Sequence, residues 1–162
     1  MYKEDDDDWI CYDTLSGHDS TVWSISFNSS GDRLVSVSDD QTVKIWQCYA
    51  PTNAEGIVTT GNDPTWKNVC TLSGYHKRAI YDVDWSHHSG LIATASGDDS
   101  IKIFREDTDG SDSRNEPIFQ LVASSEMDHS QDVNCVSWNP KDGNMLASCS
   151  DDCTIKIWEF SS

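Results

Sequence analysis

A segment that recurs three times limits the possible folds of this chain more than any other feature. In each copy, an aspartate follows a histidine by 22 or 23 residues, and an aromatic residue follows that aspartate by six. A fixed period of this kind is typical of folds that stack one supersecondary unit several times. The chain is therefore predicted to be a repeat array. The three sets are His18, Asp40 and Trp46; His76, Asp98 and Phe104; and His129, Asp152 and Trp158.

The residues between these markers predict strands. In the first copy, apolar side chains alternate with small or polar ones over residues 22–27, 34–38 and 42–46, and Gly, Asn, Asp and Ser separate the three runs. Alternation with a period of two, broken by turn residues, is typical of short antiparallel strands. The sequence thus predicts an all-β fold with at least three strands in each copy.

The marker residues also predict a hydrogen-bonded chain inside each repeat. An aspartate in a tight turn can accept the proton of one imidazole nitrogen, and the other nitrogen can meet a hydroxyl on the middle strand. That hydroxyl can in turn accept an indole N–H, from Trp46 in the first repeat and Trp158 in the third. The candidate hydroxyls are Ser36 or Ser38 in the first repeat and Ser148 or Ser150 in the third.

The second repeat differs because Phe104 has no hydrogen-bond donor. Its chain is therefore predicted to end at the hydroxyl of Thr94 or Ser96. A buried polar chain fixes one arrangement only when every member is satisfied. We expect the second repeat to be the least rigid of the three.

These repeats resemble the WD40 family, whose repeats run from Gly-His to Trp-Asp and fold as four-stranded propeller blades. The spacing of the marker residues agrees with that of the family, whereas several residue types differ from its usual pattern. Tyr75 stands between Gly74 and His76, Asp128 replaces the usual glycine, and no repeat ends in Trp-Asp. The resemblance covers nearly everything from Trp9 onward.

The resemblance implies a partial β-propeller of three consecutive blades. Blade one spans residues 16–72 with a long insert at 48–64, and blade two spans 73–122 with a linker at 106–117. Blade three, residues 123–162, is expected to lack its outer strand. Residues 9–15 would be the orphan outer strand of a preceding blade, and residues 1–8 an acidic loop. Because propellers usually have four to eight blades, the chain is expected to be the C-terminal part of a longer propeller.

Composition narrows the choice of partners. Eleven Lys and Arg against 28 Asp and Glu give a net charge of −17, which argues against binding nucleic acid or an anionic membrane and favours basic protein partners. No apolar run is long enough to span a bilayer, and the acidic N-terminus does not resemble a signal peptide. Six cysteines without a secretory context indicate reduced thiols in the cytosol or nucleus.

The sequence shows none of the familiar catalytic motifs. It contains no Gly-rich phosphate loop, no Gly-x-Ser-x-Gly elbow and no His-Glu-x-x-His. The pair His87-His88 lacks neighbouring ligands, and the spacing of Cys149 and Cys153 matches no standard zinc pattern. The chain is therefore predicted to be a binding protein, with no enzymatic activity, cofactor or metal.

The WD40 resemblance also implies a protein-binding face. Partners often dock where the turns before the first strand meet the turns between the second and third strands. The residue five past each histidine tends to line that face, and the residue before each turn aspartate joins it. The alternative for Trp23 and Tyr81 is simple packing between blades. The candidate residues are Trp23, Tyr81 and Asn134 on the strands, and Asp39, Gly97 and Asp151 in the turns.

A closer resemblance, to the cytosolic iron–sulfur protein assembly WD-repeat family, involves residues 19–24, 71–76, 79–83 and 129–141, and the insert at 61–67. It implies a non-catalytic scaffold of the cytosolic iron–sulfur targeting complex. The expected partners are other subunits of that complex and client apoproteins, in the cytoplasm and also the nucleus. The rival interpretation is a generic WD40 adaptor, such as a ubiquitin-ligase substrate receptor or a chromatin reader.

Overall fold

A computed structural model of the chain describes residues 11–59, 63–108, 116–126 and 128–161, and every regular element in these ranges is a β-strand. The strands form three antiparallel sheets, each in chain order from one edge to the other. The first sheet contains β1 (Val22–Phe27), β2 (Arg33–Ser38), β3 (Val43–Tyr49) and β4 (Thr65–Leu72). The second contains β5 (Ile80–Trp85), β6 (Ile92–Ser96), β7 (Ser100–Asp107) and β8 (Ile118–Glu126). The third contains β9 (Val133–Trp138), β10 (Met145–Ser150) and β11 (Ile155–Glu159).

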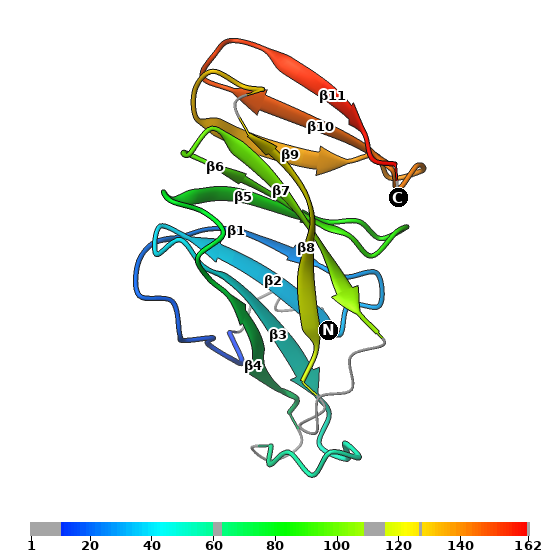
Figure 1. The fold of residues 1–162 in the computed structure, drawn as a ribbon. Coiled ribbons are helices and arrows are strands. Elements are labelled where there is room, and N and C mark those ends of the chain that lie inside the picture. Colours follow the sequence, from blue (N-terminus) through cyan, green and yellow to red (C-terminus); the bar gives the residue numbers. More distant parts are fainter. Residues whose placement is uncertain (1–10, 60–62, 109–115, 127, 162) are drawn as a thin grey trace, which may run out of the picture.

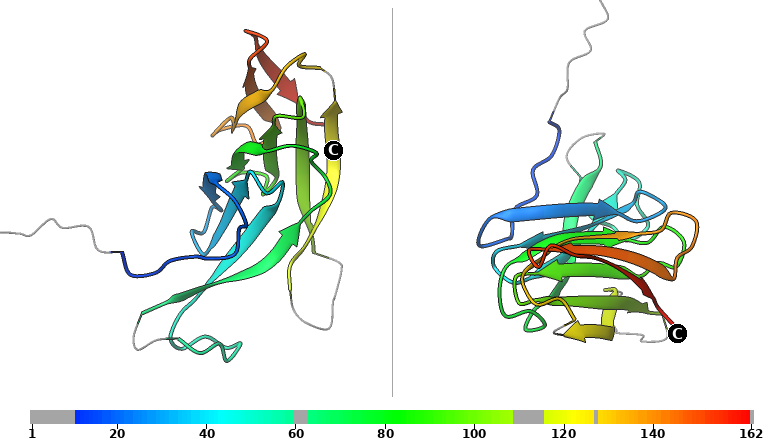
Figure 2. Two further views of the ribbon diagram at one scale, coloured as in Figure 1. Left: turned by 90° about the vertical axis from the view of Figure 1, so that its left-hand side faces the viewer. Right: turned by 90° about the horizontal axis from the view of Figure 1, so that it is seen from above.

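The three sheets stack face to face in a fan (Figure 1), and the view from the side shows the same order (Figure 2). Their first strands are neighbours, since β5 contacts both β1 and β9. This arrangement is that of three consecutive propeller blades around part of an axis, with β1, β5 and β9 as the inner strands. The prediction of an all-β, partial β-propeller is confirmed.

The strand bounds refine the expected insert and linker. Strand β3 continues to Tyr49 because it pairs with the start of β4, and β7 continues to Asp107 because it pairs with the start of β8. The predicted starts at 48 and 106 were therefore too early. Strand β4 ends at Leu72, the last residue expected for blade one, whereas β8 continues to Glu126, past residue 122 at which blade two was expected to end. In the described residues blade three has three strands. Residues 60–62 of the insert and 109–115 of the linker lie outside the described ranges.

The N-terminal segment is not a strand in the part that the structure describes. Residues 11–15 are irregular. The segment instead contacts blade one: the Trp66 indole N–H donates to the Tyr12 hydroxyl at 3.3 Å, and the Trp66 backbone N–H donates to the Asp13 carboxylate at 3.2 Å. Residues 1–8, Trp9 and Ile10 lie outside the described residues.

Two apolar layers hold the blades together. One face of blade one, which includes Val35 and Ile45, packs against Trp85 and Phe104 of blade two. The opposite face of blade two packs in the same way against blade three, with Ile103 meeting Trp138 and neighbouring side chains. Burial of apolar side chains between sheets is the main favourable contribution to such a fold. Each blade therefore needs a neighbour on both faces to bury its apolar side chains fully.

Two carboxylates of β5 link the three inner strands. Asp82 accepts hydrogen bonds from the Ser24 hydroxyl at 2.6 Å and from the Val136 backbone N–H at 3.0 Å. Asp84 accepts from the Ser26 hydroxyl at 3.3 Å and from the Trp138 backbone N–H at 2.7 Å. Bonds to a charged acceptor contribute more than neutral ones. The middle blade thus fixes the positions of both neighbours near the axis.

The predicted polar chains form in blades one and three. In blade one the His18 Nδ1–H donates to Asp40 at 2.8 Å, and His18 Nε2 accepts from the Ser36 hydroxyl at 2.7 Å. The Trp46 indole N–H donates to the same serine oxygen at 2.8 Å. A carboxylate can only accept, so the proton lies on Nδ1. The same three contacts in blade three, each at 2.8 Å, join His129, Asp152, Ser148 and Trp158.

Blade two confirms the prediction that its chain is shorter. His76 contacts Asp98 at 3.1 Å through Nδ1 and the Thr94 hydroxyl at 2.8 Å through Nε2, and the chain of side chains ends there. Phe104 is completely buried, and the ring of Tyr75 meets it edge-on with centroids 5.1 Å apart. The residue inserted before His76 thus packs on the phenylalanine that replaces tryptophan. An aromatic contact takes the place of the missing hydrogen bond.

The pKa values of the three turn aspartates are lowered. Burial alone would raise the pKa of Asp40 and Asp98, but hydrogen bonds outweigh it and lower both values well below the usual range. The main donors are Thr42 for Asp40 and His76 for Asp98. For Asp152 the hydrogen bond from Thr154 is the largest cause of an equally low pKa. All three are carboxylates at neutral pH.

Candidate protein-binding face

The turns beside the inner strands bring Trp23 and Tyr81 together. Trp23 lies near the start of β1 and Tyr81 near the start of β5, and their rings meet edge-on with centroids 5.7 Å apart. The Trp23 side chain nevertheless remains 52% exposed. The structure thus combines the two alternatives: the pair packs across the first interface between blades and still presents an aromatic surface to solvent. Its role in binding remains a prediction.

Two charged residues that sequence reasoning missed continue this surface. Arg78 donates to Asp132 from Nη1 at 2.8 Å and from Nη2 at 3.2 Å, and also donates to the Gly97 carbonyl. The Tyr81 hydroxyl donates to the same carboxylate at 3.2 Å. Arg78 and Asp132 lie in turns that precede inner strands, where the face was predicted. That position is the signal that could have found them, although their pairing depends on contact between two blades.

Gly97 makes room for this cluster. A Cβ atom at this position would lie 3.1 Å from both the Tyr81 ring and the Asp132 carboxylate, which is closer than ordinary van der Waals contact. The corresponding residues of the other blades, Asp39 and Asp151, carry side chains. The glycine predicted as part of the face therefore contributes space rather than a contact group.

The other predicted residues lie beside this cluster and are held by neighbours in their own blades. The Asn134 amide donates to Asp151 at 2.6 Å, and Asp39 accepts from the Ser20 hydroxyl at 3.2 Å. Asp39 also acts on Tyr81 through its charge: the pKa of Tyr81 is raised, first by burial, then by its hydrogen bond to Asp132, with a smaller contribution from Asp39. Tyr81 is therefore a neutral hydrogen-bond donor at physiological pH.

The residues considered for other chemistry have structural contacts. His87 bonds to the Phe27 carbonyl at 3.0 Å and so ties blade two to blade one. Cys149 pairs across the sheet with Cys135, while Cys153 occupies the turn beyond. Within the described ranges, no group of three or more His, Cys, Asp or Glu is arranged to hold a metal ion. The same ranges contain no helix of the length and apolarity needed to cross a membrane.

The Cys135 thiol is expected to react slowly with alkylating reagents. Although Cys135 retains exposed surface, its pKa is raised to about 12, first by loss of water around the thiol and then by the hydrogen bond and charge of Asp82. The reactive thiolate is therefore scarce: at pH 8 its fraction is about a thousandfold lower than for an ordinary cysteine. Iodoacetamide labelling followed by peptide mass spectrometry should show slow modification of Cys135 in the folded chain. The same residue in the urea-unfolded chain is the control, and equal rates in the two states would contradict the prediction.

This geometry defines a class of protein. The WD40 family model, described as "WD domain, G-beta repeat", matches residues 9–47, 66–105 and 120–159. The three sheets and their polar chains are consistent with that match. These segments cover most of the sequence. The chain belongs to the WD40 repeat family.

Comparison with individual proteins gives a more specific result. The chain is 55% identical, over 99% of its length, to a protein of Aedes aegypti named "Probable cytosolic iron-sulfur protein assembly protein Ciao1". It is 63% identical over 72% of its length to a Nematostella vectensis homologue of that protein, and 53% identical over 69% of its length to the human one. The matched parts are 47%, 35% and 32% of these relatives. The chain thus spans at most about half the length of these relatives.

Proposed function

We propose that this chain is a non-catalytic WD40 scaffold in the assembly of cytosolic iron–sulfur proteins. The observation that carries the proposal is the 55% identity, along 99% of the chain, to a protein named for that process. Three blades with the same architecture would supply part of the binding surface of such a scaffold. The proposed partners are other subunits of the iron–sulfur targeting complex and client apoproteins, and the proposed location is the cytosol and nucleus.

The candidate face supports a role in protein binding. Trp23 is a half-exposed indole against the Tyr81 ring, and the charge of Asp39 acts on Tyr81, whereas the Asp132 carboxylate is already paired with Arg78. Exposed aromatic side chains near the centre of a surface are frequent hot spots, and surrounding carboxylates favour basic partners. The net charge of −17 has the same effect at longer range. A basic or amphipathic peptide segment fits this surface best.

The test is affinity capture of partners from a cytosolic extract with the chain and two variants. Trp23→Ala removes the exposed indole, and Val122→Ala, on the outer strand β8, removes part of a smaller exposed apolar side chain outside the face. Loss of a hot-spot tryptophan costs about 2 kcal/mol or more, which is roughly a thirtyfold drop in affinity. Capture of iron–sulfur assembly proteins should therefore fall sharply with Trp23→Ala and remain unchanged with Val122→Ala.

The identity of the captured proteins separates the two interpretations. Recovery of iron–sulfur assembly subunits supports the proposal, whereas recovery of ubiquitin-ligase subunits or histones in their place favours the generic adaptor. If assembly subunits are captured equally by Trp23→Ala, the scaffold role stands and the location of the face is wrong.

A further inference from the structure

Two cysteines of blade three lie directly opposite each other in adjacent strands. In the register of the third sheet, Cys135 of β9 pairs with Cys149 of β10. The pKa of Cys135 is raised first by loss of water, then by Asp82, and also by the charge and hydrogen bond of Cys149, so the two thiols are in contact. The other four cysteines, all in the described residues, have no cysteine opposite them in a sheet. They are Cys11, Cys48, Cys70 and Cys153.

The register holds this pair at a separation that a disulfide can bridge. Opposed residues of an antiparallel pair of strands alternate between hydrogen-bonded and non-bonded positions. The Asn139 backbone N–H donates to the Met145 carbonyl at 2.8 Å. The pair four positions further along each strand, Cys135 and Cys149, is therefore also of the hydrogen-bonded kind, with Cα atoms about 5.5 Å apart. Disulfides usually join Cα atoms about 4.4–6.8 Å apart.

A bulge beside the pair allows the small adjustment that a disulfide needs. A disulfide draws the two Cβ atoms to about 4 Å, against about 5 Å in an ordinary opposed pair. Beyond Cys149 the register shifts, since Ser150 is opposite Val133 and Asn134 is an extra residue next to Cys135. An extra residue of this kind disrupts the ladder locally and bends the strand. The pair thus lies where the two strands can approach each other most easily.

The propeller fold does not require a cysteine at either position. At the same register positions, blade one has Ser24 opposite Val37, and blade two has Asp82 opposite Ala95. Both sheets form with these residues, and only the third repeat has cysteine at both positions. The fold therefore leaves the two thiols available for a chemical role.

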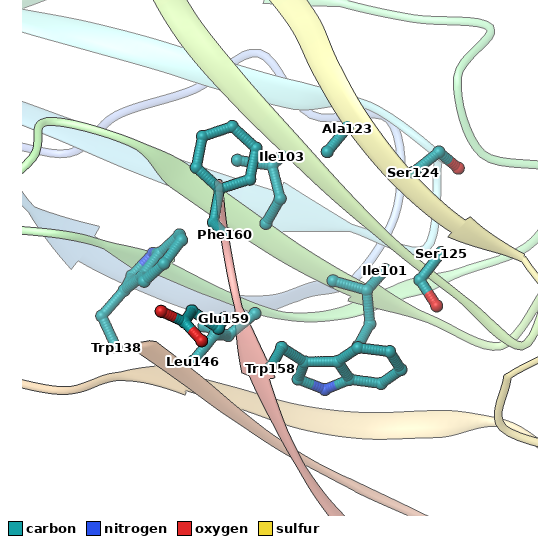
Figure 3. Close-up of a pocket in the computed structure, with 10 residues that line it drawn as sticks. All are labelled: Ile101, Ile103, Ala123, Ser124, Ser125, Trp138, Leu146, Trp158, Glu159 and Phe160. Carbon is teal, nitrogen blue, oxygen red and sulfur yellow. The ribbon is translucent and has the colours of Figure 1, made fainter. Parts of the chain in front are cut away.

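The pairing of the two cysteines is a property of one sheet. Trp138 and Leu146 lie on the face that packs against blade two, where they line the pocket drawn in Figure 3. Because side chains alternate along a strand, Cys135 and Cys149 share the opposite face. Both strands and the turn between them are in the described residues. Their register is set within this hairpin, whatever residues precede or follow the sequence.

We propose that Cys135 and Cys149 are a redox pair that a hydroperoxide converts to a cross-strand disulfide. With hydrogen peroxide, the Cys149 thiolate attacks one oxygen: an S–O bond forms, the O–O bond breaks, and the released hydroxide takes the thiol proton as water. The Cys135 sulfur then attacks the sulfenic acid: an S–S bond forms, the S–O bond breaks, and hydroxide leaves as water with the Cys135 proton. Two thiols are oxidised and one peroxide is reduced to water. Two molecules of a small thiol reverse the reaction by exchange, forming their own disulfide.

The surroundings of Cys135 set the order of these steps. Its raised pKa makes the thiolate scarce, and the thiolate is the form that attacks a peroxide. Cys149 is therefore oxidised first, and Cys135 reacts with the sulfenic acid. The disulfide also takes a donor away from Asp82, the carboxylate that accepts from Ser24 and from the Val136 backbone N–H. Oxidation thus changes a contact that joins the inner strands. This site is separate from the proposed scaffold role, and its test does not depend on any partner.

Peptide mass spectrometry of the chain treated with hydrogen peroxide tests the proposal. After the remaining thiols are blocked and the chain is digested without reduction, the predominant product should be a peptide containing Cys135 linked to the one containing Cys149. Its fraction should be independent of chain concentration, and dithiothreitol should abolish it. Cys153→Ser is the matched control, because it removes an exposed thiol of the neighbouring turn and should give the same link.

Two variants separate the roles of the two thiols. Cys135→Ser and Cys149→Ala introduce the residues that blades one and two have at these positions, so both should fold. In Cys135→Ser, the Cys149 sulfenic acid has no thiol opposite it and should proceed to sulfinic acid. In Cys149→Ala, Cys135 should remain reduced. Sulfinic acid at Cys149 of the wild-type chain without the link, or predominant links to Cys153 or between two chains, would overturn the proposal.

Discussion

Replacing Phe104 by alanine is expected to destabilise the chain by about 3–5 kcal/mol, the range for a fully buried phenylalanine truncated in a core. Phe104 has no exposed surface, belongs to the apolar layer between blades one and two, and supports the Tyr75 ring. Its loss removes buried apolar contacts and leaves a cavity that strands on both sides cannot easily fill. Urea unfolding followed by circular dichroism measures the change, and thermal unfolding should show a fall in Tm of roughly 2–4 °C per kcal/mol.

Two further variants give this prediction its controls. Phe104→Leu retains most of the apolar volume and should cost clearly less than the alanine variant, because the cost grows with the size of the cavity. Val58→Ala, at an exposed position in the insert, should change stability by no more than about 0.5 kcal/mol. Equal effects of Phe104→Ala and Val58→Ala would show that the two blades are not held together by this layer.

The second large effect is expected at Asp98, the turn aspartate of the central blade. Its carboxylate accepts hydrogen bonds from His76, from the Lys77 backbone N–H at 2.9 Å and from the Ser100 hydroxyl at 2.5 Å. Asp98→Ala would leave these donors without their acceptor at a site with little access to water. The expected loss is about 3 kcal/mol, since hydrogen bonds to charged groups are strong and donors left unsatisfied in buried sites are costly. Urea unfolding measures it.

Asp98→Asn is the matched control because it retains the shape and one carbonyl acceptor, and its loss should be smaller. Asp98→Asn also changes how the free energy of unfolding depends on pH. The pKa of Asp98 is lowered in the folded chain, mainly by the His76 and Ser100 hydrogen bonds acting against burial. Its contribution is therefore complete above the usual carboxyl pKa of about 4 and is lost as the pH falls below it. Stability measured between pH 6 and 3 should fall less steeply for Asp98→Asn than for the wild type, and parallel curves would contradict this explanation.

The polar chains show how far sequence reasoning reached. Spacing identified the histidine and aspartate of each chain and the tryptophan of the first and third, yet left two hydroxyls open in every blade. The structure selects Ser36, while Ser38 accepts the Asp40 backbone N–H at 3.0 Å and so fixes the turn. Ser38 and Ser36 are two residues apart and share a strand face. The alternation along the strand therefore does not tell which serine contacts His18. In the structure it is Ser36, the one farther from the turn.

The same division applies to the candidate face. The resemblance placed Trp23 and Tyr81 near one another, but the Arg78–Asp132 ion pair, which joins residues 54 positions apart, was missed. Neither residue belongs to the repeating pattern: Arg78 has Ser20 as its counterpart in blade one, and Asp132 has Thr21. A contact between two blades depends on which side chains the twist and stacking of the sheets bring together.

The sequence by itself determined the three repeats, most of their strands and the histidine–aspartate pair within each, because these features lie inside one antiparallel sheet whose register is set by short turns. Only the tertiary structure decided what happens between sheets. It placed Tyr75 against Phe104, linked three inner strands through Asp82 and Asp84, and left the faces of Ile25 and Ile157 open. Those outcomes depend on packing between surfaces distant in the chain, and no local spacing encodes that packing.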